Sequence, residues 1–167
     1  NPANNGEVIG YIQHADEVEM KAIVERAHNA FTNWSQTPVE QRGELLRKTA
    51  DILEEHMDEL IALCTKEAGK TPVDGVAEVR EAVDFCRYYA AKAQELLIED
   101  KFTSRGVVLC ISPWNFPLAI FLGQVTAALA VGNTVIAKPA EQTSIVGYRA
   151  TQLAHEAGIP KEVLQFL

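Results

Sequence analysis

The chain reads RGVVLCISPWNFP over residues 105–117 and VGNTVIAKPAEQT over residues 131–143. Each stretch opens on a short apolar run, at 107–111 and 134–137, of the kind that forms a strand buried on both faces of a sheet. Each run then passes into a polar turn that contains proline, which restricts the backbone. The repeated pattern predicts two strands of a parallel sheet, each followed by a rigid polar turn.

Helices are predicted between and after these strands. Pro117 opens a helical segment that runs through Val131, and Thr143 caps a second one that ends near Gly158. A third apolar run follows at residues 163–167. The order strand, helix, strand, helix, strand predicts an α/β fold, a doubly wound, parallel, Rossmann-like unit with right-handed crossovers.

The first hundred residues are predicted to be helical. Asp16 opens the first helix with the signature of a capping box. Thr37 caps a second helix, whose apolar face continues without interruption to Gly69, and a third helix runs from Thr71 to about Leu97.

A polar segment at residues 99–104 separates the helical part from the α/β part. We therefore expect residues 1–104 to form the N-terminal helical part of a ligand-binding domain. Residues 105–167 then start its Rossmann-like core, with an incomplete sheet. The chain stops inside a predicted strand, which indicates a fragment.

Composition excludes several classes of function. The net charge of −8 argues against nucleic-acid binding, because phosphate contacts need clustered Lys and Arg. No apolar run is long enough for a transmembrane segment, and the polar start shows no signal peptide, so we expect a cytoplasmic protein. The cysteines are scattered, which predicts no metal site and three inert core thiols: Cys64, Cys86 and Cys110.

Polar side chains follow both strands at the edge where parallel sheets bind ligands. Asn115 either donates its amide to a developing oxyanion or caps the following helix. Lys138 and Glu141 either hydrogen-bond the paired hydroxyls of a ribose or form an exposed ion pair. The dinucleotide fingerprint GxGxxG is absent.

These stretches resemble two motifs of the aldehyde dehydrogenase superfamily. Residues 113–117 are similar to its PWNFP motif, residues 132–141 to its GNTVxxKPxE motif, and residues 67–70 to its EAGK helix end. Residues 110–121 and the helix at 77–85 further resemble the pyrroline-5-carboxylate dehydrogenase half of the bacterial bifunctional proline utilization A family. The fold implied is aldehyde-dehydrogenase-like.

The resemblance implies a role for individual residues. Asn115 steadies the oxyanion, Phe116 faces the aldehyde channel, and Glu81 faces the same channel or is a solvated helix charge. Lys138 and Glu141 hold the adenine ribose, and the carboxylate favours NAD over NADP. The full set of cofactor contacts implied is Ile111, Ser112, Pro113, Trp114, Lys138, Ala140 and Glu141.

The reaction implied is NAD-dependent oxidation of an aldehyde, glutamate semialdehyde, to glutamate. The nucleophilic cysteine and the general-base glutamate belong to a catalytic domain beyond residue 167, so we expect this chain to be inactive alone. The resemblance implies a homodimer at full length, and FAD only in a separate proline dehydrogenase domain. The alternatives are another semialdehyde dehydrogenase, or a non-catalytic dehydrogenase-like module used for oligomerisation.

Overall fold

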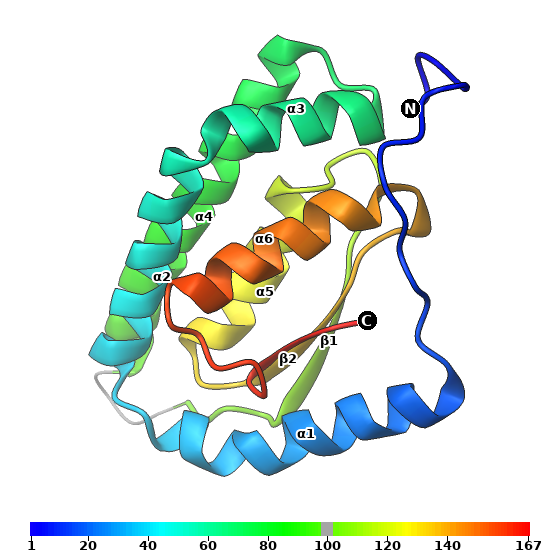
Figure 1. Cartoon of the computed structure of the whole chain (residues 1–167). Coiled ribbons are helices and arrows are strands. Elements are labelled where there is room, and N and C mark those ends of the chain that lie inside the picture. Colours follow the sequence, from blue (N-terminus) through cyan, green and yellow to red (C-terminus); the bar gives the residue numbers. More distant parts are fainter. Residues whose placement is uncertain (98–101) are drawn as a thin grey trace.

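A computed structural model describes residues 1–97 and 102–167 and shows a three-stranded sheet beside a layer of helices (Figure 1). The polar junction expected at residues 99–104 lies partly outside the described residues. The helical part contains α1 (Glu17–Gln36), α2 (Val39–Glu55), α3 (Met57–Ala68) and α4 (Pro72–Leu97). The α/β part contains β1 (Val107–Ile111), α5 (Ala119–Ala130), β2 (Thr134–Lys138), the 3-10 turn η1 (Glu141–Thr143), α6 (Ser144–Glu156) and β3 (Leu164–Phe166).

The sheet is parallel, in the order β1-β2-β3, which confirms the predicted strand and helix order. The first two strands are in register from Val107 opposite Thr134 to Ile111 opposite Lys138. Helices α5 and α6 lie on one face of the sheet and α1 lies on the other (Figure 1). Two successive crossovers of the same hand place both connecting helices on one face, so α1 is needed to cover the opposite face.

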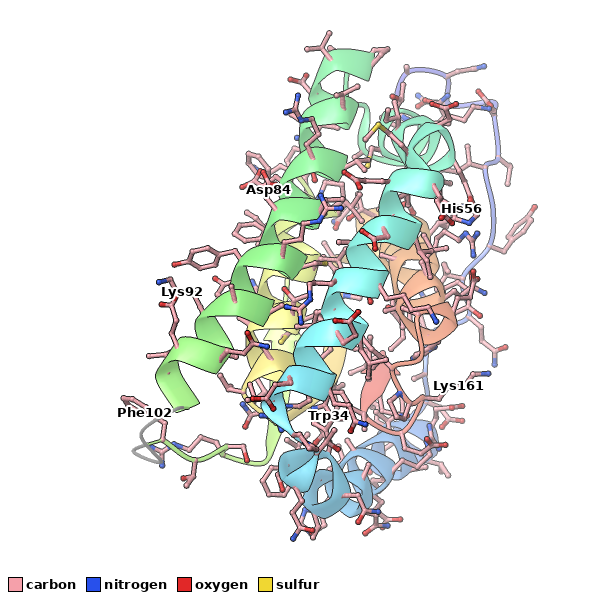
Figure 2. The ribbon with its side chains drawn as sticks, turned by 90° about the vertical axis from the view of Figure 1, so that its left-hand side faces the viewer. Trp34, His56, Asp84, Lys92, Phe102 and Lys161 are labelled. Atoms are coloured by element: carbon pink, nitrogen blue, oxygen red, sulfur yellow. The ribbon has the colours of Figure 1, made fainter. Side chains whose placement is uncertain are left out.

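The helical part and the sheet share one hydrophobic core. Helix α4 packs between α2 and α5, and Figure 2 shows α2 and α4 side by side with Trp34 at the foot of α2. The indole of Trp34 is buried and donates to the carbonyl of Leu129 at 3.2 Å. Arg42, also buried, donates from Nε to the carbonyl of Ala130 at 3.0 Å. These two side chains donate to carbonyls in the last turn of α5, where helical carbonyls lack the usual partner four residues later.

Two details of the helical part differ from the prediction. The predicted second helix is interrupted at His56, where the backbone (φ −100°, ψ 19°) departs from helical values and α3 begins. The N-cap predicted at Thr37 is also wrong, because its hydroxyl donates backward to the carbonyl of Asn33 at 3.0 Å. Thr37 therefore serves the end of α1 rather than the start of α2. The C-terminal glycine of α3 is confirmed, since Gly69 has φ 69°.

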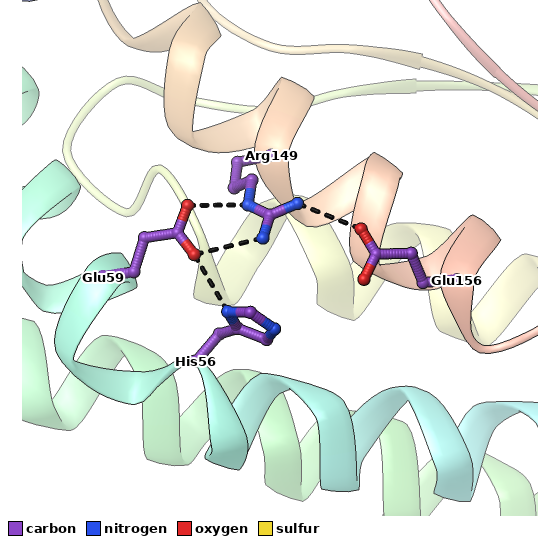
Figure 3. A network of polar contacts seen from close by, with 4 residues as sticks. All are labelled: His56, Glu59, Arg149 and Glu156. Carbon is purple, nitrogen blue, oxygen red and sulfur yellow. Dashed lines mark hydrogen bonds and ion pairs between the residues drawn. The ribbon is translucent and has the colours of Figure 1, made fainter.

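The interruption at His56 lets α3 run toward α6, and ion pairs join the two helices (Figure 3). The guanidinium of Arg149 binds Glu59 through Nε at 2.7 Å and through Nη2 at 3.1 Å. Its Nη1 binds Glu156 at 3.1 Å. Nδ1 of His56 lies 2.9 Å from Glu59. A bidentate contact of this kind fixes orientation as well as distance.

Strand β2 is buried on both faces, as predicted, but β1 is not. Leu109 and Ile111 are 53% and 59% exposed, whereas Cys110 between them is buried. Leu109 and Ile111 lie on the same face of β1 as Val107, which packs against the α1 residues Ile23 and Ala27, and the described residues leave the rest of that face uncovered. None of the described helices is long and apolar enough to cross a membrane.

Candidate functional site

The two polar turns lie next to each other at the carboxyl edge of the sheet. The amide of Ser112 donates to the carbonyl of Lys138 at 3.1 Å, one step beyond the last paired residues of β1 and β2. This confirms that the residues after the two strands share one edge. It is also the edge at which open parallel sheets bind ligands.

A cleft of about 410 Å³ opens beside the second turn. The side chains of Lys138 and Glu141 line it and lie 2.9 Å apart, with 34% and 64% of each side chain exposed. The hydrogen bond from Lys138 lowers the pKa of the Glu141 carboxyl, so the carboxylate is charged at neutral pH. A lysine donor beside a carboxylate acceptor can hydrogen-bond two adjacent hydroxyls, the lysine by donating and the carboxylate by accepting. The opposite wall is formed by residues 12–15, the start of α1 and the end of β3.

Asn115 lies in the first turn, between β1 and α5. Its side chain is exposed and makes no hydrogen bond to any residue that the structure describes. The alternative that Asn115 caps the next helix is wrong, because that helix begins at Ala119, later than the start predicted at Pro117. The amide of Asn115 is therefore available to a ligand, held on a turn between two prolines.

Glu78 of α4 performs the capping that Asn115 does not. Its carboxylate is 2% exposed and accepts from the amides of Leu118 at 3.2 Å and Ala119 at 2.9 Å. Nζ of Lys70 lies 2.9 Å from the other carboxylate oxygen and 4.3 Å from the centre of the Phe116 ring. Sequence reasoning missed both residues, because the local pattern around them gives only a helix face and a motif end.

Glu67 has the equivalent position at the second turn. It accepts from the amides of Ile145 and Val146 at 2.8 Å each, at the start of α6. Burial raises the pKa of Glu67, and these two hydrogen bonds oppose the rise. Thr143 stands at the N-cap position, but its hydroxyl makes no capping bond, so the predicted cap is wrong in its chemistry. The EAGK stretch thus supplies Glu67 to one turn and Lys70 to the other.

The remaining predicted residues differ in exposure. Ser112 is buried, Pro113 and Ala140 are half-buried, and three apolar side chains are exposed: Ile111, Trp114 and Phe116. Glu81 is exposed on α4 beside a shallow groove, and no described contact brings it to the first turn.

The three cysteines are buried, and burial raises the pKa of each thiol, to about 12 for Cys64 and Cys86 and to about 11 for Cys110. This confirms that they are core residues, and burial of this kind makes a thiol a poor nucleophile. Within residues 1–97 and 102–167, no cluster of His, Cys, Asp and Glu is arranged to hold a metal ion.

The chain is similar to known proteins in both sequence and structure. The bifunctional protein PutA of Salmonella typhimurium strain LT2 is 45% identical over 167 residues, which are 100% of this chain and 13% of that protein. The crystal structure of proline utilization A from Bdellovibrio bacteriovorus, inactivated by N-propargylglycine, matches with a TM-score of 0.95 and 40% identity, over 100% of this chain and 19% of the other. The Thermus 1-pyrroline-5-carboxylate dehydrogenase with bound NAD matches with a TM-score of 0.88 and 39% identity, over 92% and 32%.

The chain thus spans only 13% of its PutA relative and 32% of the Thermus enzyme that it matches. The sequence profile of the aldehyde dehydrogenase family covers the whole length of the chain. It matches residues 1–167, so the chain belongs to the aldehyde dehydrogenase family.

Proposed function

We propose that this chain forms part of the NAD site and the oxyanion site of an aldehyde dehydrogenase that oxidises glutamate semialdehyde to glutamate in proline catabolism. The observation that carries the proposal is the side-chain amide of Asn115, which no described residue hydrogen-bonds, on the same sheet edge as the Lys138–Glu141 pair. Similarity to the Thermus 1-pyrroline-5-carboxylate dehydrogenase supports this choice of substrate.

The second turn fits the ribose of NAD. Lys138 donates to one hydroxyl and Glu141 accepts from the other, while the cleft beside them has room for the adenosine half. Glu141 disfavours a 2′-phosphate, because two negative charges would meet there. We assign Ile111, Ser112, Pro113 and Trp114 to the nicotinamide half of the NAD site, and Ala140 to a further contact with the cofactor. When bound, NAD supplies the hydride acceptor of the reaction.

The first turn supplies charge stabilisation. When a thiolate adds to an aldehyde carbon, the carbonyl oxygen becomes an oxyanion, and a fixed amide donor stabilises that charge more than it stabilises the neutral aldehyde. Asn115 is this donor, Phe116 faces the aldehyde channel, and Glu81 is assigned to the same channel from α4. The exposed apolar side chains of β1 and its turn keep water from the reacting atoms once a catalytic domain covers them.

The buried thiols of this chain do not provide the nucleophile. We assign the nucleophilic cysteine and the general-base glutamate to residues outside the chain, and therefore propose that residues 1–167 alone do not reduce NAD. Residues 1–104 and 105–167 would be two parts of one NAD-binding domain, in keeping with their shared core. The full-length enzyme would be a homodimer, and any FAD would belong to a separate proline dehydrogenase domain.

The test is an assay of NAD reduction by the full-length protein with pyrroline-5-carboxylate and with a panel of simple aldehydes. A strong preference for pyrroline-5-carboxylate supports the proposal. Activity with other aldehydes alone would keep the reaction class and remove the assignment to proline catabolism. Absence of activity with all of them would favour a non-catalytic role.

A further inference from the structure

The turn that carries Asn115 has no regular structure of its own, so something else must hold it. Residues 112–118 lie outside both β1 and α5. The end of the turn is fastened by Glu78, whose buried carboxylate accepts from the amides of Leu118 and Ala119. A carboxylate is the favoured partner there, because the start of a helix carries unpaired N–H groups and partial positive charge.

Lys70 contacts both the capping carboxylate of Glu78 and the turn itself. It neutralises the buried carboxylate of Glu78 at 2.9 Å, with only 18% of its own side chain exposed. The same ammonium lies 4.3 Å from the centre of the Phe116 ring. One lysine thus contacts both the cap and the residue next to Asn115, and this fixes the turn at two points.

We propose that Glu78 and Lys70 are positioning residues for the oxyanion step, acting through the turn 112–118 on the amide of Asn115. The proposal rests on the proposed function of Asn115. An oxyanion donor must be held to within a few tenths of an ångström, and misplacement by about 1 Å costs on the order of 100-fold in rate. Loosening the cap therefore reduces kcat, while the ribose contacts at the second turn remain intact.

Glu67 provides a matched control in the same chain. It is also a carboxylate from the helical part, and it also accepts from two amides at the start of a crossover helix. Its helix, α6, follows the turn that carries Lys138 and Glu141 rather than the turn of Asn115. A purely structural role for such caps would make the two glutamates equivalent in every kinetic constant.

The experiment compares Glu78→Gln and Glu67→Gln in the full-length protein, with kcat, KM for NAD and hydrogen exchange measured on each. We expect Glu78→Gln to lower kcat about 10-fold or more, with KM for NAD within about twofold of wild type. We expect Glu67→Gln to raise KM for NAD about 10-fold or more, with kcat within about twofold of wild type. Exchange should rise across residues 112–119 in the first variant and across 138–147 in the second. Lys70→Met should reproduce the Glu78 effect, and Lys70→Arg should retain most of kcat, because it keeps the charge.

Equal changes of kcat and KM in the two glutamine variants, or unchanged exchange across residues 112–119 in Glu78→Gln, would overturn the positioning role. Hydrogen exchange tests whether Glu78 holds the turn, independently of whether the protein oxidises an aldehyde. Failure of the proposed function is a separate result, recognised when the wild-type protein is inactive or when Asn115→Ala leaves kcat unchanged. If Glu78→Gln does not fold, Lys70→Met against Lys70→Arg gives the same comparison.

Discussion

Two asparagines of this chain should respond to truncation in opposite ways. Asn115 is exposed and unbonded among the described residues, so Asn115→Ala should change the free energy of unfolding by less than about 0.5 kcal/mol. Asn133 is buried: its Oδ1 accepts from the amides of Arg105 at 2.6 Å and Gly106 at 3.2 Å, and its Nδ2 donates to the carbonyl of Ala128 at 3.2 Å. Losing three such bonds at about 1 kcal/mol each predicts roughly 3 kcal/mol of destabilisation for Asn133→Ala.

The effects of the two substitutions on catalysis should be opposite to their effects on stability. Removing one oxyanion donor costs about 3–4 kcal/mol of transition-state stabilisation, which is a fall in kcat of about 100- to 1000-fold. Asn115→Ala should therefore lose kcat with an unchanged Tm, whereas Asn133→Ala should lower Tm and keep kcat per folded molecule. Steady-state assays of the full-length protein, together with thermal melts of both variants, measure the two effects. If Asn115→Ala keeps kcat within about threefold of wild type, the oxyanion assignment is refuted.

Three further outcomes follow from the charges and the burial. Glu141→Gln should raise KM for NAD about 10-fold without changing Tm, because its partner Lys138 forms with it only an exposed pair; an unchanged KM would count against the ribose site. Arg149 lowers the pKa of Glu59 from 4.5, so this ion pair stabilises the fold above that value and ceases to do so as the pH falls through the lowered pKa. The loss of Tm in Arg149→Met should therefore be larger near pH 7 than near pH 3, and an equal loss would be contrary to this linkage. Thiol labelling at about pH 8 should leave the buried cysteines unmodified until the protein is denatured, whereas rapid native labelling would show that one of them is accessible; the three are Cys64, Cys86 and Cys110.

The sheet was predictable because its determinants are local. The apolar runs at 107–111 and 134–137 are bounded by turn residues, and each is separated from the next by one helix length. Parallel pairing then places Asn115 and Lys138 on the same edge without any knowledge of side-chain contacts. Burial was harder to predict, since Leu109 is apolar yet exposed on the edge strand. Which part of a strand face is covered depends on the helices that pack on the sheet, here α1 from the start of the chain.

The caps were not predictable because their partners are distant in sequence. Glu78 serves an amide 40 residues later, and Glu67 serves one 78 residues later. Local rules assigned the second cap to Thr143, the side chain nearest to the helix start, and offered Asn115 for the first. Both helix starts in fact lie against α3 or α4, and a carboxylate from the neighbouring helix replaces the local hydroxyl or amide. The interruption at His56 has the same origin, because it directs α3 toward α6.

The occupied helix starts also give a physical reason for the missing GxGxxG fingerprint. In the usual dinucleotide fold, glycines let the pyrophosphate approach the unpaired N–H groups at the start of the first crossover helix. Here a carboxylate already accepts from those groups, from Glu78 at α5 and from Glu67 at α6. A phosphate at either place would meet a negative charge and find its donors in use, so glycines there would serve no purpose. A bound dinucleotide with a phosphate oxygen within hydrogen-bonding distance of the Ala119 amide would contradict this argument. The chain therefore keeps the parallel sheet edge of the dinucleotide fold. In the proposed function it would bind the cofactor through side chains such as Lys138 and Glu141, and the turn after β1 would be left to hold Asn115.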